Sequence, residues 1–341
     1  MSKETPLKKD FISVVMSNYN TPINYLKESI DSVLNQTYSY FEFIIIDDGS
    51  TDDSLEFIKS YDDPRIKLIV NEENIGLTKS LNKGLDVAQG EYIARMDPDD
   101  TCYPERFEKQ IEYMREHPDT IVCGTWANLI NEKNDITEES WARQTIDDMD
   151  KYRINLLFDN KPQIIHPTTF LNNKLLKDYD IKYNEYYRYA QDYEMWTICS
   201  KYANCYINPC VLLNYRQHSK NISFSKANEQ KECAIQIIQK QLGLLNLSLT
   251  DDLKPLHFRF LNEQRPYNSK IKKWLRKIIK ANKKYNIYNH RMLKNILWYR
   301  WSEISYEELS ESSFMRRIQI ILSMSFVCKL NLFKIRKSYR K

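Results

Sequence analysis

The chain has 341 residues, of which 42% are hydrophobic and 28% charged, a composition typical of a globular protein with one or two domains. Its seven cysteines include no C-x-x-C pair, which argues against a disulfide framework and a cysteine zinc site and favours a reducing compartment. Residues 1–10 lack the apolar core of a signal peptide, and no apolar run reaches the roughly 20 residues that span a bilayer. We therefore expect a cytoplasmic protein.

The net charge of +4 hides an uneven distribution. Residues 261–341 carry 20 Lys and Arg against 5 Asp and Glu, whereas residues 1–260 carry 30 against 41. An acidic body followed by a basic segment indicates two separate tasks on one chain.

The first hundred residues repeat a pattern of strand, loop and helix. The predicted strands are the apolar runs 11–16, 41–46, 65–70 and 90–97. Runs that are almost continuously apolar are typical of a parallel sheet with both faces covered. Ligands of open α/β sheets bind at the carboxyl ends of the strands. Polar residues gather at those ends, namely Ser17, Asp47, Asp48, Asp97 and Asp99.

Beyond residue 100 the pattern is less regular. We predict strands at 120–124, 164–170 and 211–218, a helix within 185–203 and an exposed polar insertion at 131–150. Helical spacing continues from about residue 226. The sequence contains neither a G-x-G-x-x-G motif after the first strand nor a P-loop, which argues against a dinucleotide dehydrogenase and a P-loop enzyme.

Three carboxylates, Asp97, Asp99 and Asp100, follow the fourth predicted strand. Crowded carboxylates repel one another unless a cation neutralises them, so the cluster is either a metal site or an acidic turn before a helix. Asp100 and Thr101 are suited to cap the helix predicted around Pro104. Asp100 would either support the metal ligands or act as this cap, and we favour the cap.

Seven short segments, in this order and spacing, resemble the inverting GT-A glycosyltransferases of family 2, which use a nucleotide-sugar donor. They are VVMSNYN (14–20), SVLNQT (32–37), IDDGSTD (46–52), NIGL (74–77), GEYIARMDPDD (90–100), QDYE (191–194) and YRQH (215–218). Within the family, the chain is most similar to bacterial lipooligosaccharide and capsule transferases that add a hexose or N-acetylhexosamine.

The resemblance implies an α/β fold of the GT-A type, with a Rossmann-like, mostly parallel central sheet flanked by helices. This domain would occupy residues 1–225, with a nucleotide-sugar-binding half at 11–100 and an acceptor-side half at 101–225. Residues 226–341 would form a basic helical extension. The resemblance covers about two-thirds of the chain and implies nothing specific for this extension.

The same resemblance implies residues that bind the donor. Ser17, Tyr19 and Asp48 would contact the base and ribose, and a carboxylate opposite a ring N–H would select uracil, hence a UDP-sugar. Arg216 would contact the diphosphate. The alternative for Asp48 is a plain turn beside a helix cap.

Asp97 and Asp99 resemble the DxD element of the family. Asp99 would bind Mn²⁺ or Mg²⁺, since both cations prefer hard oxygen ligands. Asp97 would contact the ribose or a metal-bound water, and also belongs to the donor-binding set. His218 is a further candidate metal ligand.

Asp192 matches the catalytic base of the family, which takes the proton of an acceptor hydroxyl in a single displacement with inversion. Its alternative role is a helix N-cap. Glu194 would point about 200° away on the same helix, so only one of the two carboxylates can face the site. His166 is a candidate on the acceptor side.

The basic segment 261–341 suits either an anionic membrane surface or a solvated helical bundle, and we expect no nucleic acid partner. The apolar run 318–328, flanked by Arg and Lys, suits an interfacial helix. The predicted enzyme therefore lies at the inner face of the cell membrane and acts on a glycan or lipid-linked sugar acceptor. The alternatives are a sugar nucleotidyltransferase, for which no Gly-rich basic loop follows the first strand, and a catalytically silent scaffold of the same fold.

Overall fold

The computed structural model describes residues 6–141, 143–158, 164–219, 221, 225–259 and 269–311. The chain divides into two compact units, one of residues 1–147 and 161–233, the other of residues 148–160 and 234–341. Segment 148–160 therefore belongs with the C-terminal helices, although the sequence predicts it within the acceptor-side half. The predicted interfacial run 318–328 lies outside the described residues.

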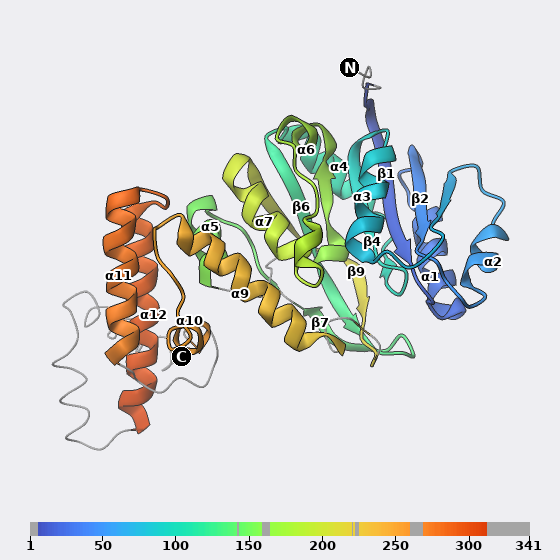
Figure 1. The fold of residues 1–341 in the computed structure, drawn as a ribbon. Coiled ribbons are helices and arrows are strands. Elements are labelled where there is room, and N and C mark those ends of the chain that lie inside the picture. The colour runs from blue at the N-terminus through green and yellow to red at the C-terminus, as the bar shows by residue number, and fades with distance from the viewer. Residues whose placement is uncertain are drawn as a thin grey trace. The chain divides into compact units, whose positions relative to one another are not determined.

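Four parallel strands form one half of a nine-stranded mixed sheet in the first unit (Figure 1). Their order is β3-β2-β1-β4, and a helix follows each of the first three, as the repeated pattern predicted. The elements are β1 (Lys8–Asn18), α1 (Ile23–Leu34), β2 (Phe41–Asp47), α2 (Ser54–Lys59), β3 (Ile66–Val70), α3 (Leu77–Val87) and β4 (Gly90–Met96).

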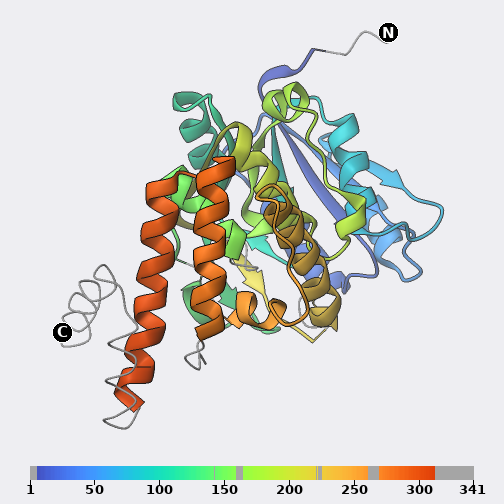
Figure 2. The ribbon, with the colours of Figure 1, turned by 60° about the vertical axis from the view of Figure 1, so that its left-hand side comes forward.

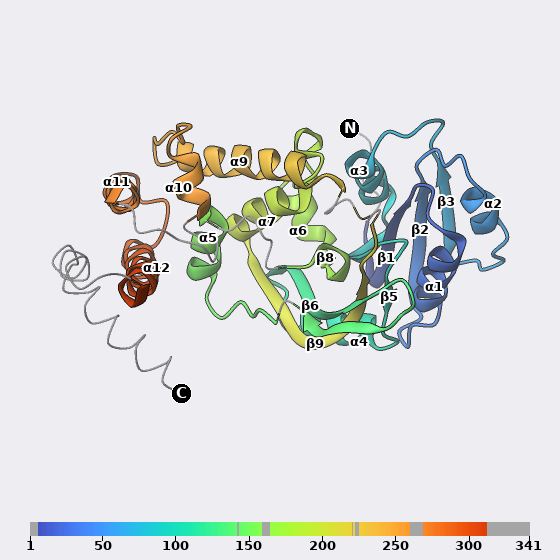
Figure 3. The same cartoon turned by 90° about the horizontal axis from the view of Figure 1, so that it is seen from below.

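Helices cover both faces of these strands, which explains their continuous apolar runs. Seen from below, α1 and α3 lie on opposite sides of β1 and β2 (Figure 3). Gly84 of α3 lies so close to Val15 that a Cβ atom there would come within 2.4 Å of its Cγ1. On the other face, Leu26 of α1 joins Val14 and Phe43 in the main apolar core. Strands buried on both sides are typical of a parallel sheet.

The other half of the sheet mixes strand directions. Strand β8 runs antiparallel to β4 and β6, β9 runs parallel to β6, and β7 forms a hairpin with β6. The elements are β5 (Thr101–Cys102), α4 (Arg106–Glu116), β6 (Thr120–Ile130), β7 (Ile136–Trp141), η1 (His166–Thr168), β8 (Phe170–Asn172), α6 (Asn173–Asp178), η2 (Glu185–Tyr187), α7 (Gln191–Tyr202) and β9 (Asn204–Arg216).

Two predictions for this half are wrong in part. Part of the predicted exposed insertion, residues 136–141, pairs with β6 as a strand. The predicted strand 164–170 begins instead with the 3-10 turn η1, which has Pro167 near its start. Proline has no N–H to donate to a strand ladder and is favoured at the first turn of a helix, so the extended structure begins only at Phe170.

The capping role predicted for Asp100 is also wrong. The two-residue strand β5 follows it directly and pairs with β9, so that Thr101 lies opposite Asn214. Helix α4 begins only at Arg106, and its N-cap residue Glu105 makes no capping side-chain hydrogen bond. Asp100 is fully buried. Asp100 therefore does not cap α4, and its carboxylate is part of the acidic loop after β4.

The second unit is helical. It contains α5 (Met149–Phe158), most of α9 (Ala227–Gly243), α10 (Lys254–Arg259), α11 (Ser269–Tyr285) and α12 (His290–Glu311). Helices α11 and α12 lie side by side (Figure 2) and bury Trp274 and Trp301. The indole Nε1 of Trp274 donates to Nδ1 of His257 at 3.0 Å, and burial lowers the pKa of His257 to about 4. None of the described helices is both long and apolar enough to cross a membrane.

Candidate functional site

The strand register brings the predicted donor-binding residues to one edge of the sheet. Asn18 pairs with Asp47 and Met16 with Met96, so β1, β2 and β4 end at the same level. Ser17, Asp48 and the loop after Met96 therefore start from neighbouring points. This part of the site follows from the order of elements, because the carboxyl ends of parallel strands share an edge.

The nucleotide-side residues differ in exposure. Tyr19 is 48% exposed, whereas Ser17 and Asp48 are buried. Asp48 Oδ1 accepts from Asn71 Nδ2 at 2.8 Å and from the Ile75 amide at 3.0 Å. Asp48 Oδ2 accepts from the Gly76 amide at 2.8 Å. Asp48 thus holds loop 71–76 beside the site, and a base N–H would share an oxygen that already accepts a hydrogen bond.

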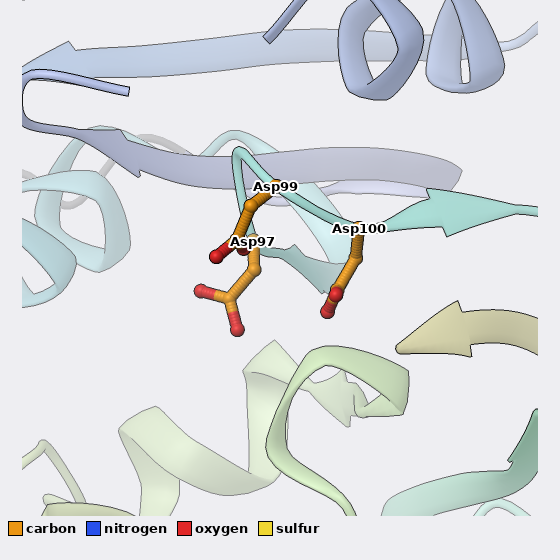
Figure 4. A group of neighbouring side chains, drawn as sticks. All are labelled: Asp97, Asp99 and Asp100. Atoms are coloured by element: carbon orange, nitrogen blue, oxygen red, sulfur yellow. The ribbon is translucent and has the colours of Figure 1, made fainter. Parts of the chain in front are cut away.

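The carboxylates of Asp97, Asp99 and Asp100 form the centre of the site. One oxygen from each lies within 4.8 Å of the others, and Figure 4 shows all three side chains extending from the loop after β4. Burial raises the pKa of Asp97, although the neighbouring Arg95 opposes the shift. Burial, followed by the charges of Asp99 and Asp97, raises the pKa of Asp100 well above its usual range.

The cluster fits a hard divalent cation. Oδ1 of Asp100 accepts from the Arg216 amide at 2.8 Å, whereas Oδ2 is buried and has no hydrogen-bond partner among the described residues. A buried carboxylate oxygen without a donor is costly unless a positive charge approaches it. Oxygen donors alone are the ligand set that Mg²⁺ and Mn²⁺ prefer.

Arg95 is a buried cation that the sequence reasoning did not single out. It lies on β4, is 3% exposed and forms an ion pair with Asp97. Its Nε has no hydrogen-bond partner in the described part of the chain. The detectable signal was a single arginine within the apolar run Tyr-Ile-Ala-Arg-Met, since a charge in a buried strand requires a partner.

Asp192 lies in the first turn of α7 and shares this electrostatic environment. Its Oδ1 accepts from the Tyr193 amide at 2.8 Å. Burial raises the pKa of Asp192, the charge of Arg95 opposes that shift, and the charge of Asp97 adds to it. Glu194 faces elsewhere, as helix geometry predicted: it is 1% exposed, and its Oε1 accepts from Asn184 Nδ2 at 3.4 Å.

His166 lies in η1 and is buried. Its Nε2 is 2.8 Å from the Tyr183 hydroxyl, and its ring packs edge-on against Trp196. Burial, with a smaller effect of Arg95, holds the pKa of His166 well below its usual range. His166 is thus packed between Tyr183 and Trp196, and its place on the acceptor side stays a prediction.

Arg216, which we predicted to contact the diphosphate, is already bound by protein oxygens. It is 0% exposed, and all three guanidinium nitrogens already donate to protein oxygens: Nε to Asp99 O at 2.8 Å, Nη2 to Glu28 at 2.6 Å and Nη1 to Asn134 at 2.5 Å. A diphosphate would have to displace these partners. The structure instead gives Arg216 a role in holding the acidic loop.

His218 also acts on that loop. Its Nε2 lies 2.9 Å from Asp99 Oδ2, and its ring stacks on Tyr25 at 5.6 Å. Because an ionised carboxylate oxygen only accepts, Nε2 is the donor in this hydrogen bond, and His218 orients Asp99 through it. The role of His218 as a metal ligand stays a prediction.

Solved structures share this fold. S. aureus TarS, residues 1–349 in complex with UDP, aligns with a TM-score of 0.54 and 20% identity over 86% of this chain and 87% of that one. The same TarS fragment in complex with UDP-GlcNAc aligns with a TM-score of 0.53 and 18% identity over 96% and 91%. The first unit thus has the GT-A fold that the sequence predicted, with helices following it.

Sequence comparisons give the family. The model of Glycosyl transferase family 2 matches residues 13–180. A glycosyltransferase of Haemophilus influenzae is 30% identical over 344 residues, which cover 97% of each chain. The amylovoran biosynthesis glycosyltransferase AmsE of Erwinia amylovora is 28% identical over 239 residues, 68% of this chain and 86% of AmsE. The chain belongs to glycosyltransferase family 2, and its relatives include an enzyme of amylovoran biosynthesis.

Proposed function

We propose that this glycosyltransferase moves a hexose or N-acetylhexosamine from a UDP-sugar, with inversion, to a hydroxyl group of a glycan or lipid-linked acceptor in bacterial capsule or lipooligosaccharide synthesis. The observation that carries the proposal is the environment of Asp192. A carboxylate from α7 and the acidic loop after β4 come close enough to share the buried charge of Arg95.

In this proposal Asp192 is the general base. Its carboxylate takes the proton of the acceptor hydroxyl as that oxygen forms a bond to the anomeric carbon. The bond from this carbon to the diphosphate oxygen breaks on the opposite side, and UDP leaves with the bonding electron pair. Burial favours the base, since a raised pKa brings a carboxylate closer to the operating pH, where proton transfer is most efficient.

The acidic loop serves the leaving group in this proposal. Asp99 would ligate Mn²⁺ or Mg²⁺, with Asp97 on the ribose side or bonded to a metal-bound water, and the free oxygen of Asp100 turned to the same charge. When bound, the cation supplies positive charge that stabilises the departing diphosphate. Ser17, Tyr19 and the loop held by Asp48 would enclose the nucleotide.

The donor class rests on the TarS complexes with UDP and UDP-GlcNAc, whose fold this chain shares. We further propose that residues 226–341 bring the enzyme to the inner face of the cell membrane. Support comes from the uneven charge: α11 alone, Ser269–Tyr285, contains eight Lys and Arg and no acidic residue. A basic helix of this kind binds anionic lipid surfaces.

The decisive experiment separates donor binding from donor cleavage, with water as the acceptor. The purified chain is incubated with Mn²⁺ and each of UDP-Gal, UDP-Glc, UDP-GlcNAc and UDP-GalNAc, and UDP release is measured. The Asp192→Asn variant should bind UDP as tightly as wild type and lose about 10²-fold or more in turnover with the active donor. Turnover within threefold of wild type would remove Asp192 as the base. In a parallel incubation with UTP and a sugar 1-phosphate, formation of pyrophosphate would indicate a nucleotidyltransferase instead.

A further inference from the structure

A closed ring of hydrogen bonds lies beside the carboxylate cluster and joins three distant segments. Arg216, at the end of β9, donates from Nη2 to Glu28 Oε2 on α1 at 2.6 Å and from Nη1 to Asn134 Oδ1 at 2.5 Å. Asn134 closes the ring by donating from Nδ2 to Glu28 Oε1 at 3.3 Å. Because a guanidinium group is planar and presents its donors in a fixed fork, the ring holds it in one orientation.

The same arginine donates two hydrogen bonds to the acidic loop. Its Nε donates to the Asp99 carbonyl oxygen at 2.8 Å, and its backbone amide donates to Asp100 Oδ1 at 2.8 Å. Its guanidinium carbon lies 4.5 Å from the centre of the Tyr25 ring, which closes one face of the group. The direction of the Nε–H bond, and therefore the position of the Asp99 backbone, follows from how Glu28 and Asn134 orient the other two nitrogens.

The turn between β6 and β7 is built to present Asn134. Its φ is +68°, a left-handed conformation that asparagine and glycine adopt more readily than other residues. Asn131 braces the turn, since its Oδ1 accepts from the amides of Lys133 at 2.8 Å and Asp135 at 3.0 Å, and its carbonyl accepts from Arg216 Nη1 at 3.3 Å. Asn134 is exposed and Glu28 is half-buried, whereas Arg216 is fully buried.

We infer that Glu28 and Asn134 are positioning residues for cation binding: through Arg216 they set the place of Asp99, although neither lies in the acidic cluster. The inference rests on the proposed metal role of Asp99 and concerns how that role is supported. Groups that orient a metal ligand commonly change metal affinity about 10- to 100-fold when they are removed. The turn between β6 and β7 would thus influence cation binding although it lies outside the acidic cluster.

The test measures metal binding without catalysis. Free Mn²⁺ is followed by electron paramagnetic resonance while the full-length protein is titrated, with and without UDP. Asn134→Gly removes the side chain but keeps the left-handed turn, and should raise the Kd of Mn²⁺ about tenfold. Asn134→Asp keeps the turn and the oxygen that accepts from Arg216 but loses the donor to Glu28, so it should restore part of the affinity. Glu28→Gln, which loses the charge but keeps an acceptor oxygen, should fall between them.

Matched control variants separate the positioning of Asp99 from a general loss of protein stability. Asn286→Gly changes another left-handed asparagine, with φ +51°, in the helical unit, and Glu56→Gln changes an exposed glutamate of α2. Both should bind Mn²⁺ as wild type does. Equal Kd values for Asn134→Gly and wild type would overturn the inference, even if Asn134→Gly melted at a lower temperature. So would an equal loss in Asn286→Gly.

Asp99→Asn distinguishes this inference from the proposed function. If Asp99→Asn loses Mn²⁺ binding and Asn134→Gly does not, the metal role stands and only the positioning role is refuted. If Asp99→Asn binds Mn²⁺ as tightly as wild type, the metal role itself is refuted, and the positioning inference with it. A graded series, with Asp99→Asn weakest, then Asn134→Gly, then Asn134→Asp, supports both.

Discussion

Replacement of Asp100 by asparagine should make the metal-free protein more stable and its cation site weaker. Asparagine has almost the same shape, and its side-chain oxygen can still accept from the Arg216 amide, which lies 2.8 Å from Asp100 Oδ1. What changes is the charge, together with the buried Oδ2 that lacks a donor among the described residues. The substitution therefore tests whether the cluster is built for a cation at the expense of stability.

The magnitude follows from the spacing of the carboxylates. Two unit charges 4.8 Å apart repel by about 3.5 kcal/mol at an effective dielectric constant of about 20. The ion pair of Arg95 with Asp97 and the contact of His218 with Asp99 offset part of this repulsion. We expect a gain of about 1–3 kcal/mol in the free energy of unfolding at pH 7.

The pH dependence has a defined sign. Burial and the neighbouring carboxylates raise the pKa of Asp100 in the folded protein, so the folded state binds this proton more tightly than the unfolded chain. Stability from this group therefore increases as the pH falls from above the raised pKa toward about 3.9, the usual value for Asp. The advantage of Asp100→Asn over wild type should shrink over the same range.

Urea unfolding in EDTA, followed by tryptophan fluorescence, measures the first effect, with Asp62→Asn on the exposed surface as a control that should not change stability. Addition of Mn²⁺ at 100 times its Kd should stabilise wild type by about 2.7 kcal/mol and the variant by less at the same concentration. A variant less stable than wild type in EDTA, or equally stabilised by Mn²⁺, would refute the reasoning.

Three further predictions concern catalysis and membrane binding. If Asp192 must be ionised, kcat/KM should fall on acidification with an apparent pKa above 3.9, because burial raises the pKa of this carboxyl; a rate independent of pH down to pH 4 would contradict it. Since the charge of Arg95 lowers the pKa of Asp192, Arg95→Gln should move this acidic limb to higher pH and Arg95→Lys should move it less; identical profiles would show that Arg95 does not act on the base. The full-length protein should sediment with anionic vesicles at 0.1 M salt and much less at 0.5 M salt or with neutral vesicles, as screening predicts; salt-independent binding would exclude an electrostatic surface.

Much of the fold could be predicted because its signals are local. The continuous apolar runs of β1 to β4 and the helical spacing between them indicate a covered parallel sheet. Strand order then places Ser17, Asp48 and Asp97 at one edge, since carboxyl ends of parallel strands coincide. The acidic loop was recognisable because three carboxylates follow a buried strand, whereas Asp192 was a candidate only through the resemblance of QDYE (191–194) to the family pattern.

What each polar atom does was decided only by the tertiary structure. Asp100 does not have the capping role predicted for it, because the residues after it form β5 and pair with β9, more than a hundred positions away. Arg216 proved to be a buried support because Glu28 and Asn134, from two other segments, bind its donors. Arg95 gained its importance from two carboxylates that approach it from different elements. Hydrogen-bond satisfaction depends on neighbours in space, and the spacing of residues along a single chain does not specify them.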